Sequence, residues 1–531
     1  MKRSYFLALA ALTLCGGLHA QDIYKVESLS GSDLNGTARF VGMGGAMSAL
    51  GADISTMGSN PAAIGMFRRS DVAFTASATI QPNGTTMADI EKARGSFDQA
   101  GFVYACKLGK SGLKFFNMGF NYQKRRNFKN YIANLGIRTL DGMSQSWQMM
   151  DLAYYNGRPL DLHPESPDCD YTTPLTLIGH DTQMIAPIYN DKNELTGYSP
   201  SFANSYSYRR AQWGGIRQYD FNLSMNWEDQ VYAGLTIGVY DVDMHTETDY
   251  SEILVDDKGT KDLYRMTNSE ILEGTGVDVK LGIILRPIEE SPFRLGFSVS
   301  TPIFYDLSQR SYLYMCSPYD YTDKEGTTHP YTEADGETGI DYRIRSPWRF
   351  NLSMGTTVGN YLALGAEYEV AHSKGAQVRY PEYDDYDGYT TQSKRDRALD
   401  HEIDACLKAV HTFRIGAEAR LARGVFGRIG YNYVSAPFKK NAFLNLFTDS
   451  PSYAYSTNTD YVNLGAINRI TAGLGFRGKH FYADATYQYQ AQQGDVYAFH
   501  VAEDDGITNR LQAQKVDLNR HNVMFTIGYK F

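Results

Sequence analysis

Long hydrophobic runs are missing from the sequence outside its first 20 residues. A bundle of membrane helices needs apolar segments of about 20 residues each, so this class of protein is excluded. Positive charge is also in deficit, because the net charge is −9 and a nucleic-acid-binding surface is basic. Wholesale disorder is excluded by the 13% of aromatic residues, since disordered chains contain few. We therefore expect a folded protein that binds no nucleic acid.

Cysteine is scarce, with 5 in 531 residues and no CxxC pair. This spacing specifies neither a zinc site nor a disulfide framework, and it leaves open whether Cys169, Cys316 or Cys406 form a disulfide. The HExxH, GxSxG and phosphate-loop motifs of common enzymes are absent as well. We therefore predict no metal, no cofactor and no catalytic activity.

The first 20 residues have the order of a secretory signal peptide. Lys2 and Arg3 precede an apolar stretch over residues 5–14, and small residues lead up to Ala20. This succession of charged, apolar and small residues is typical of an export signal. We predict a signal peptide over residues 1–20. The exact cleavage site stays open, because Leu18 occupies a position that small residues prefer.

The end of the chain shows most clearly the pattern that repeats from residue 71 onward. Apolar residues alternate over residues 522–531 with Asn, Met, Thr, Gly and Lys. A period of two indicates a strand with one apolar face. The opposite face is polar or small, and aromatic residues gather near the segment ends, as in membrane β-barrels with lipid outside and a polar lumen inside. The apolar positions of this last strand are Val523, Phe525, Ile527, Tyr529 and Phe531.

Fourteen such segments can be counted, and the connections between them alternate between short turns and long polar loops. Short periplasmic turns, long outer loops and an even strand number are typical of outer-membrane barrels. We therefore predict an all-β fold, a 14-stranded antiparallel transmembrane β-barrel over residues 71–531, whose largest extracellular loop spans 125–214. A secreted sandwich or propeller would need a second apolar face or blade repeats. The segments are 71–80, 101–108, 113–122, 219–227, 231–240, 277–285, 293–299, 342–358, 362–370, 413–419, 425–433, 470–476, 481–489 and 518–531.

The aromatic C-terminal residue, Phe531, ends the last alternating strand. A terminal aromatic residue in this position resembles the signal by which outer-membrane barrels are recognised for insertion. We therefore expect the barrel assembly machinery to be a partner through Phe531.

The segment over residues 21–70 does not alternate and is rich in glycine. Met43 to Leu50 is compatible with one short helix, and Asn60 is a good N-cap for a second helix that begins at Pro61. Small apolar residues favour packing, so we expect this segment to form a small helical hatch inside the barrel lumen. The alternative is a periplasmic tail.

A resemblance covers the whole mature chain. The stretch GTARFVGMGGAMSALGADISTMGSNPAAIGMF, residues 36–67, resembles the N-terminal hatch of the FadL/TodX family of outer-membrane transporters for hydrophobic compounds, and SPWRFNLSMG from Ser346 resembles a mid-barrel strand of that family. Fourteen strands is also that family's number. The large 125–214 loop departs from the family pattern. The positions that carry the hatch motif are Gly44, Gly45, Asp53, Asn60, Pro61 and Ala62.

The resemblance implies passive uptake of hydrophobic or amphipathic molecules, such as long-chain fatty acids, across the outer membrane of a Gram-negative bacterium. Ligand would bind among the outer loops, pass to a pocket near the hatch, and leave sideways into lipid at an inward kink of the third strand. Gly119 in that strand is the candidate for the kink, because glycine tolerates a bend. We expect a monomer, although the sequence leaves the oligomeric state, the ligand and the role of the 125–214 loop open.

Parity along the strands places several arginines inside the lumen, among carboxylates such as Glu367, Glu369 and Glu418. Confined charges need partners, so one interpretation is an arginine–glutamate ladder between strands. The other is that some arginines meet an anionic ligand head, because guanidinium binds carboxylate in bidentate fashion. The candidates are Arg349, Arg414, Arg428 and Arg469.

Three other functions stay open on the sequence alone. The long loops are compatible with a surface receptor or adhesin, and loop His and Tyr residues are compatible with haem uptake. A phospholipase or protease built on a barrel would need a catalytic cluster assembled only in space. Fourteen strands and a hatch argue against the enzyme, and a large haem receptor would need a far bigger plug than residues 21–70, whereas the receptor or adhesin stays the alternative to transport.

Overall fold

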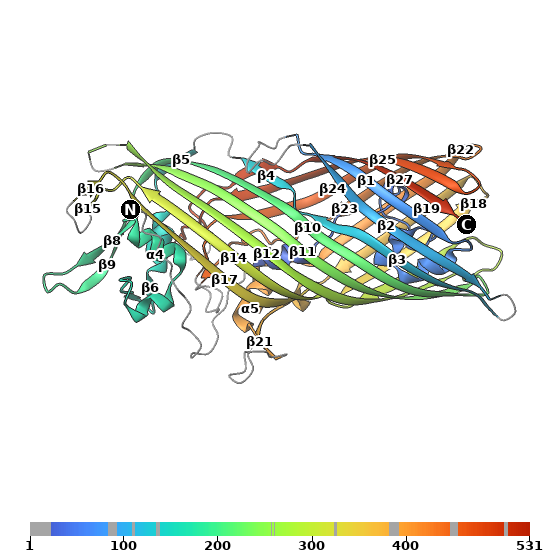
Figure 1. Ribbon diagram of the computed structural model, residues 1–531, viewed down its shortest axis with the longest axis horizontal. Coiled ribbons are helices and arrows are strands. Elements are labelled where there is room, and N and C mark those ends of the chain that lie inside the picture. Colours follow the sequence, from blue (N-terminus) through green and yellow to red (C-terminus); the bar gives the residue numbers. More distant parts are fainter. Residues whose placement is uncertain are drawn as a thin grey trace.

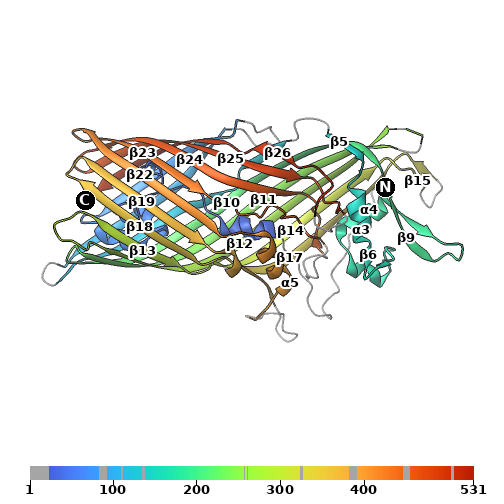
Figure 2. The same cartoon turned by 180° about the vertical axis from the view of Figure 1, so that it is seen from behind.

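Fourteen strands close into one antiparallel barrel in the computed structural model (Figures 1 and 2). The structure describes residues 23–82, 93–108, 112–133, 138–255, 258–259, 261–322, 327–381, 392–446, 455–503 and 508–531. The predicted signal peptide, residues 1–20, therefore lies outside the described residues. In order around the barrel the strands are β1 (Asp71–Ile80), β2 (Ala93–Lys107), β3 (Leu113–Asn127), β10 (Ala203–Trp227), β11 (Val231–Val255), β12 (Lys261–Leu285), β13 (Arg294–Ser300), β18 (Arg349–Val358), β19 (Leu362–Ala371), β22 (Val410–Ala422), β23 (Val425–Val434), β24 (Tyr461–Arg477), β25 (Phe481–Tyr497) and β27 (Arg520–Lys530).

Pairing of the first strand with the last closes the barrel. β1 and β27 are in register from Asp71↔Lys530 to Ile80↔His521. This pairing satisfies the backbone polar groups of the first and last strands within the sheet. The predicted fold class is confirmed. Phe531 follows the last strand, is 61% exposed, and donates its backbone N–H to Ser70 O at 3.1 Å.

Apolar side chains face outward around the part of the barrel next to the short turns, called here its lower part; the end with the long loops is the upper part. In β27, Val523, Phe525 and Ile527 are exposed, whereas Met524 and Thr526 between them are buried toward the hatch. β12 shows the same band at alternate positions from Val277 to Leu285. This alternation creates the lipid-facing surface of a membrane barrel. None of the helices in the described part of the chain is long and apolar enough to cross a membrane.

Three neighbouring strands, β10, β11 and β12, are each 25 residues long, far longer than the segments of about ten that alternation predicts. Above the apolar band, the apolar side chains of these strands lie on the inward face and the polar side chains on the outward face. In β11, Ile237 is exposed and Thr236 buried, but farther along Val242 and Met244 are buried while Asp241 faces out. Hydrophobic positions move from the outside to the inside, so the outward apolar pattern stops at the membrane although the strand continues.

The predicted 125–214 loop is therefore shorter than expected, since β3 continues to Asn127 and β10 begins at Ala203. Residues 143–202, called here the loop domain, contain most of the remainder. Above the membrane band the wall also includes several further elements. The elements between β3 and β10 are β4 (Asn130–Ala133), β5 (Arg138–Gly142), α3 (Ser146–Leu152), β6 (Tyr154–Tyr155), β7 (Arg158–Pro159), η3 (Pro167–Tyr171), α4 (Pro174–Asp181), β8 (Ile185–Tyr189) and β9 (Leu195–Pro200); the others are β14 (Phe304–Ser317), β15 (Tyr321–Thr322), β16 (Thr328–His329), β17 (Thr332–Arg345), η4 (Ser373–Gly375), β20 (Gln377–Pro381), β21 (Ser393–Arg395), α5 (Arg397–Cys406) and β26 (Gln514–Asp517).

The loop domain packs into the long-loop end of the barrel through one hydrophobic core. Met149 and Ile178 of the domain join Tyr264 of β12 and Met315 of β14 in this core, which extends to Phe499 beyond β25. The core therefore reaches walls on both sides of the barrel. Because apolar side chains fill this end, access from outside is narrower than an open loop funnel would allow.

A buried carboxylate joins the loop domain to β11. Glu252 accepts hydrogen bonds from Ser144 Oγ at 2.6 Å, Gln145 N at 2.7 Å and Tyr250 OH at 2.5 Å. Burial raises the pKa of the Glu252 carboxyl from 4.5 to about 7, although the hydrogen bonds oppose the rise. The folded domain thus holds a proton between about pH 4.5 and 7 that the unfolded segment has released, so lower pH stabilises the folded form.

We expect the loop domain to become more stable as pH falls from 8 to 5.5. Hydrogen exchange over residues 144–152, corrected for intrinsic rates, should show roughly 30-fold higher protection at the lower pH, because pH 5.5 lies about 1.5 units below the folded-state pKa and each unit corresponds to a tenfold change. The Glu252→Gln variant should lose this dependence. Equal protection of the unsubstituted protein at both pH values would contradict the assignment.

The hatch lies inside the barrel, as predicted. Its elements are α1 (Ile23–Ser30), α2 (Ala38–Gly42), η1 (Ile54–Gly58) and η2 (Pro61–Met66). The helix expected over Met43–Leu50 is wrong, because the helix comes earlier, over α2, and residues 43–50 form turns. Gly44 and Gly45 end it with φ values of +63° and +82°, a left-handed backbone that glycine adopts readily.

Candidate functional site

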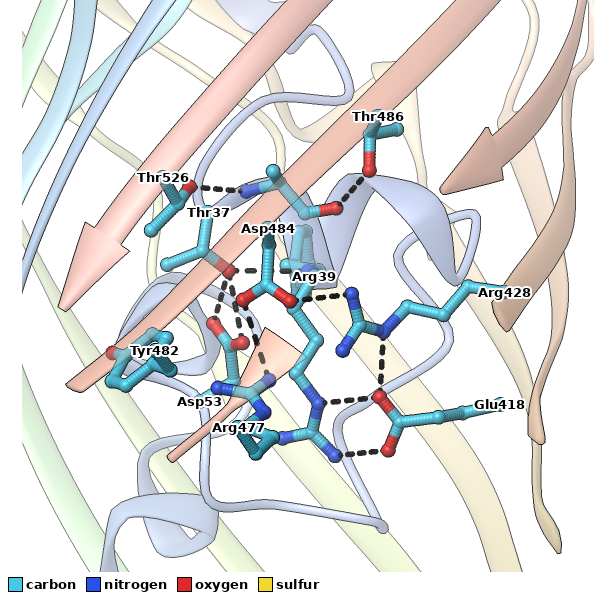
Figure 3. A network of polar contacts seen from close by, with 12 residues as sticks. Thr37, Arg39, Asp53, Glu418, Arg428, Arg477, Tyr482, Asp484, Thr486 and Thr526 are labelled. Atoms are coloured by element: carbon cyan, nitrogen blue, oxygen red, sulfur yellow. Dashed lines mark hydrogen bonds and ion pairs between the residues drawn. The ribbon is translucent and has the colours of Figure 1, made fainter. Parts of the chain in front are cut away.

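Charged side chains fasten the hatch to the inner wall (Figure 3). Arg39 of α2 forms two hydrogen bonds with Glu418 of β22, at 3.0 and 2.9 Å. Arg428 of β23 bridges Glu418 at 2.6 Å and Asp484 of β25 at 2.7 Å, and Arg477 lies 3.3 Å from Asp484. Arg428 therefore belongs to a ladder between strands and hatch, and its charge is already compensated.

Hydrogen bonds from the backbone of α2 reach two further strands. Ala38 N donates to Thr526 Oγ1 of β27 at 2.7 Å, and Ala38 O accepts from Thr486 Oγ1 of β25 at 2.5 Å (Figure 3). Asp53, the acidic residue of the hatch motif, accepts from Thr37 Oγ1 at 2.8 and 2.9 Å. These bonds hold α2 against the wall and connect it to η1.

The glycines of the hatch motif allow the hatch backbone to lie directly against the backbone of the barrel wall. A Cβ at Gly44 would lie 2.8 Å from Tyr431 N and 3.0 Å from Ile415 O. The wall contributes glycine at the same contact, since a Cβ at Gly430 would lie 2.2 Å from Gly44 N. Only glycine fits on both sides, so the motif encodes a close approach between hatch and barrel.

The Asn60-Pro61-Ala62 part of the motif forms a capped turn against β11 and β12. Asn60 Oδ1 accepts from Ala62 N at 3.1 Å and caps η2, which is a 3-10 helix. A Cβ at Gly234 would lie 2.4 Å from Pro61 C, and one at Gly282 would lie 2.1 Å from Asn60 Oδ1. The predicted N-cap is present, and the turn lies directly on wall glycines.

Asn60→Ala should destabilise the second half of the hatch by about 1 kcal/mol, the usual cost of losing a side-chain cap. Hydrogen exchange of residues 61–66 should accelerate while the barrel keeps its abundance and heat-modifiable mobility. The exposed Asn193 is a suitable control position, since Asn193→Ala lies in the loop domain. Unchanged hatch protection in the Asn60 variant, together with unchanged uptake, would refute the role.

Between α1 and the rest of the hatch lies a cavity of about 220 Å³, called here the chamber. Phe40 and Gly58 line it from the hatch, and Val26 lines it from α1. The chamber is lined by three carboxylates, those of Glu27, Asp33 and Glu369, and by six guanidinium groups. The arginines are Arg125, Arg126, Arg349, Arg414, Arg469 and Arg520.

Arg414 and Arg469, two of the predicted luminal arginines, have acidic partners. Arg414 pairs with Glu367 and, at 3.1 Å, with Glu369, so the ladder interpretation fits it. Arg469 lies 3.4 Å from Asp33 and is otherwise held by neutral side chains. A second group of chamber arginines is less compensated.

Arg349 donates to Ser30 O of α1, a neutral acceptor. Arg125 is 6% exposed, and its Nε and Nη2 have no hydrogen-bond partner in the described part of the chain. Its Nη1 reaches Gln218 Oε1 at 3.4 Å. Arg520 Nε is likewise buried without a partner there. Arg125 and Arg520 both line the chamber, and a guanidinium without a full set of acidic partners is suited to binding an anion.

Arg125 and Arg126 do not follow from strand parity. The pairing of β3 with β10 shifts by one residue at Arg125, so Ile216 faces Arg126 whereas Arg217 faces Lys124. This bulge directs two consecutive side chains into the lumen. In the sequence, the only indication of this bulge is that two consecutive arginines, Arg125 and Arg126, stand near the end of the strand.

The barrel wall separates between β2 and β3 at the level of the chamber. Their pairing ends at Gln99↔Gln123, and the hatch takes over as partner of β3 beyond that point. Asp33 N donates to Arg125 O at 2.8 Å, and Asn35 Nδ2 donates to Lys124 O at 3.0 Å. The upper edge of β3 is therefore satisfied by a hatch segment that is not part of the barrel.

Gly119, predicted as a kink, is paired in register with Val103 on one side and Asn222 on the other. A Cβ there would lie 2.2 Å from Met57 Cε of the hatch. Gly119 thus makes room for η1, and the irregularity of β3 is six residues farther on, at Arg125. The kink assignment is corrected accordingly.

Metal and disulfide chemistry find no support in the described residues. No group of His, Cys, Asp and Glu there could hold a metal ion. Cys106, Cys169, Cys316 and Cys406 are free, which answers the disulfide question that the sequence leaves open.

A closed fourteen-stranded barrel with a luminal hatch and a wall opening defines the class of hatch-containing membrane β-barrels. Its fold is that of a Pseudomonas aeruginosa FadL homologue, with a TM-score of 0.50 and 13% identity over 94% of this chain and 100% of that chain. The Ralstonia pickettii toluene transporter TbuX aligns with a TM-score of 0.46 and 11% identity over 94% and 99% of the two chains. No family model and no curated protein matches the chain.

Proposed function

We propose that the protein is a passive channel in the outer membrane of a Gram-negative bacterium for hydrophobic or amphipathic molecules with an anionic head, such as long-chain fatty acids. The chamber carries this proposal, because it offers buried guanidinium groups without a full set of acidic partners. The FadL homologue shares the fold. The channel would act as a monomer and without catalysis.

The chamber suits a ligand with two unlike ends. Arg125 and Arg349 would bind an oxyanion by charge-assisted hydrogen bonds. Apolar side chains line the same cavity, including Phe128 and Leu464. A hydrocarbon ligand would leave the arginines unsatisfied, so an anionic amphiphile fits better than toluene does.

We propose that ligand leaves sideways between β2 and β3. A hydrocarbon chain gains roughly 0.8 kcal/mol per CH₂ by passing into lipid rather than periplasmic water. The hatch blocks the straight route, and the Arg39–Glu418 salt bridge and the hydrogen bonds of Ala38 to Thr526 and Thr486 would have to break to clear it. At the wall, by contrast, the backbone ladder between β2 and β3 ends at Gln99↔Gln123. Beyond it, in the described part of the chain, the segment around Asp33 and Asn35 and the hydrogen bond from Lys124 Nζ to Ser96 Oγ lie between the two strands.

The experiment that tests the function is uptake of radiolabelled palmitate by cells that lack their own fatty-acid channel and express this protein. Hexadecanol, which has a similar chain and no charge, is the matched ligand. We expect faster palmitate uptake than in empty cells, and a smaller gain for hexadecanol. No gain for either compound, with folded barrel in the outer membrane, would refute the proposal.

Gly119→Val should reduce palmitate uptake and leave the passage of small hydrophilic solutes nearly unchanged. The added methyl groups must displace Met57, which shifts the hatch away from β3, and the same hatch contacts β3 at the proposed exit through Asp33 and Asn35. Gly95→Val is the control, because a Cβ at Gly95 has nothing within 4 Å. If uptake persists in a folded Gly119 variant while a disulfide that locks the hatch to the wall abolishes it, the hatch is the gate instead.

A further inference from the structure

Arginine side chains form a row on the outer surface of the barrel, across β17, β20 and β21. Arg343 of β17 pairs directly with Arg379 of β20, and Arg379 pairs with Arg395 of β21. Ile344 and Val378, the alternate positions, are fully buried inside the barrel. The arginines therefore face outward, together with Arg345. Like charges directly opposite one another destabilise a sheet, so the row needs a compensating anion.

This row, called here the arginine patch (Arg343, Arg345, Arg379 and Arg395), has few acidic partners. Arg343 lies 3.1 Å from Asp306, and Arg395 pairs with Asp400. Arg379 donates to Ser393 Oγ at 2.9 Å, and no ion pair of Arg345 or Arg379 exists within the described residues. Burial and the charges of Arg345 and Arg395 lower the pKa of Arg379.

The patch lies at the upper boundary of the lipid-facing band. Arg345 pairs with Phe304 in the sheet, and its guanidinium lies 5.3 Å from the centre of that ring. Phe304, Trp348 and Phe350 are 44%, 45% and 44% exposed, and such aromatic residues mark membrane–water interfaces. The next outward residue of β14 after Phe304 is Asp306, so the apolar outer surface of the barrel ends at Phe304. Figures 1 and 2 show the neighbouring α5 and β21 projecting from the side of the barrel.

We infer that the arginine patch binds the phosphate groups of a phosphorylated lipid headgroup in the outer leaflet, of the lipid A type. The patch offers several guanidinium groups, which hold phosphate in bidentate fashion, immediately above an aromatic belt that contacts the acyl chains. A lipid seated there would have its charge on the patch and its chains on Phe304 and Phe350. The inference depends on the outer-membrane orientation of the proposed function and not on transport.

The test is binding of fluorescent lipid A to the detergent-solubilised full-length protein. Arg345→Gln/Arg379→Gln should weaken binding about 30-fold, since each basic residue near an anionic surface contributes about 1 kcal/mol, which is about fivefold in affinity. Arg345→Lys/Arg379→Lys should restore part of it. The control is Arg310→Gln, which removes another outward arginine, 3.2 Å from Glu273 on the wall above, and should have no effect.

Three outcomes would overturn the inference. Equal binding by the double variant would mean that other groups hold the lipid, or that the four acidic residues of 382–391, outside the described part of the chain, already neutralise the patch. Equal binding of dephosphorylated lipid A would exclude phosphate recognition. Displacement of lipid A by millimolar inorganic phosphate would indicate a site for free phosphate. Palmitate uptake by the double variant should be normal, which separates this result from the proposed function.

Discussion

Replacing Arg125 and Arg349 together by glutamine should lower the affinity of the purified protein for palmitate about 100-fold. Each hydrogen bond to a charged group contributes about 1.5 to 3 kcal/mol, and 1.4 kcal/mol corresponds to a factor of ten in affinity. Glutamine retains polar atoms and removes the charge, so the chamber stays hydrated and the barrel should fold. Titration with a fluorescent fatty acid, followed by displacement with palmitate, measures the change.

The charge of the ligand provides an internal control for this variant. Affinity for hexadecanol should change less than threefold, because the alcohol has no charge for the arginines to bind. Arg310→Gln, on the outer wall, should leave both affinities unchanged. A double variant that binds palmitate as tightly as the original protein would show that the arginines of the chamber serve only the structure.

Gly44→Val should release the hatch from the wall while the barrel remains closed. The residue adopts φ +63°, which costs a side-chain-bearing residue about 1 to 2 kcal/mol, and its Cβ would collide with Tyr431 N at 2.8 Å. The two effects together should lower the protection of residues 34–67 in hydrogen exchange by at least roughly 30-fold. Leakage of a large hydrophilic antibiotic into the cell should rise.

Gly339→Val is the matched control, because a Cβ there meets its nearest atom, Gln309 O, at an ordinary 3.6 Å. It should alter neither leakage nor hatch protection. A Gly44 variant with normal hatch protection would mean that the close approach of hatch and wall contributes little to holding the hatch in place.

The sequence predicts the membrane part of the barrel well, because lipid imposes one rule on every strand. Outward positions such as Phe525 and Ile527 must be apolar, and inward positions such as Thr526 are free to be polar. Above the membrane the rule reverses. Val242 is buried inside and Asp241 is outside, so alternation read as an outward pattern ends the strand too early.

The site was predicted in part. The Asn60 cap depends on neighbours close in sequence and is predicted, whereas the close approach of Gly44 to Gly430 joins residues far apart in the chain. Arg349 and Arg469 follow from parity and do line the chamber. Arg125 does not, because a one-residue bulge shifts parity and leaves no trace in composition. Gly119 is predicted as a kink but is a site of close contact with the hatch, because a glycine in a strand indicates close approach as readily as a bend.

The hatch contacts also set the order of assembly. The backbone N–H of Ala38 donates a hydrogen bond to Thr526, 488 residues later in the chain, and Arg39 pairs with Glu418, which is also far along the chain. Contacts between residues so far apart form late in folding, because the long intervening loop must first be closed at an entropic cost. We therefore expect these contacts between hatch and wall to form only when the last strand pairs with β1, so that the hatch docks as the barrel closes.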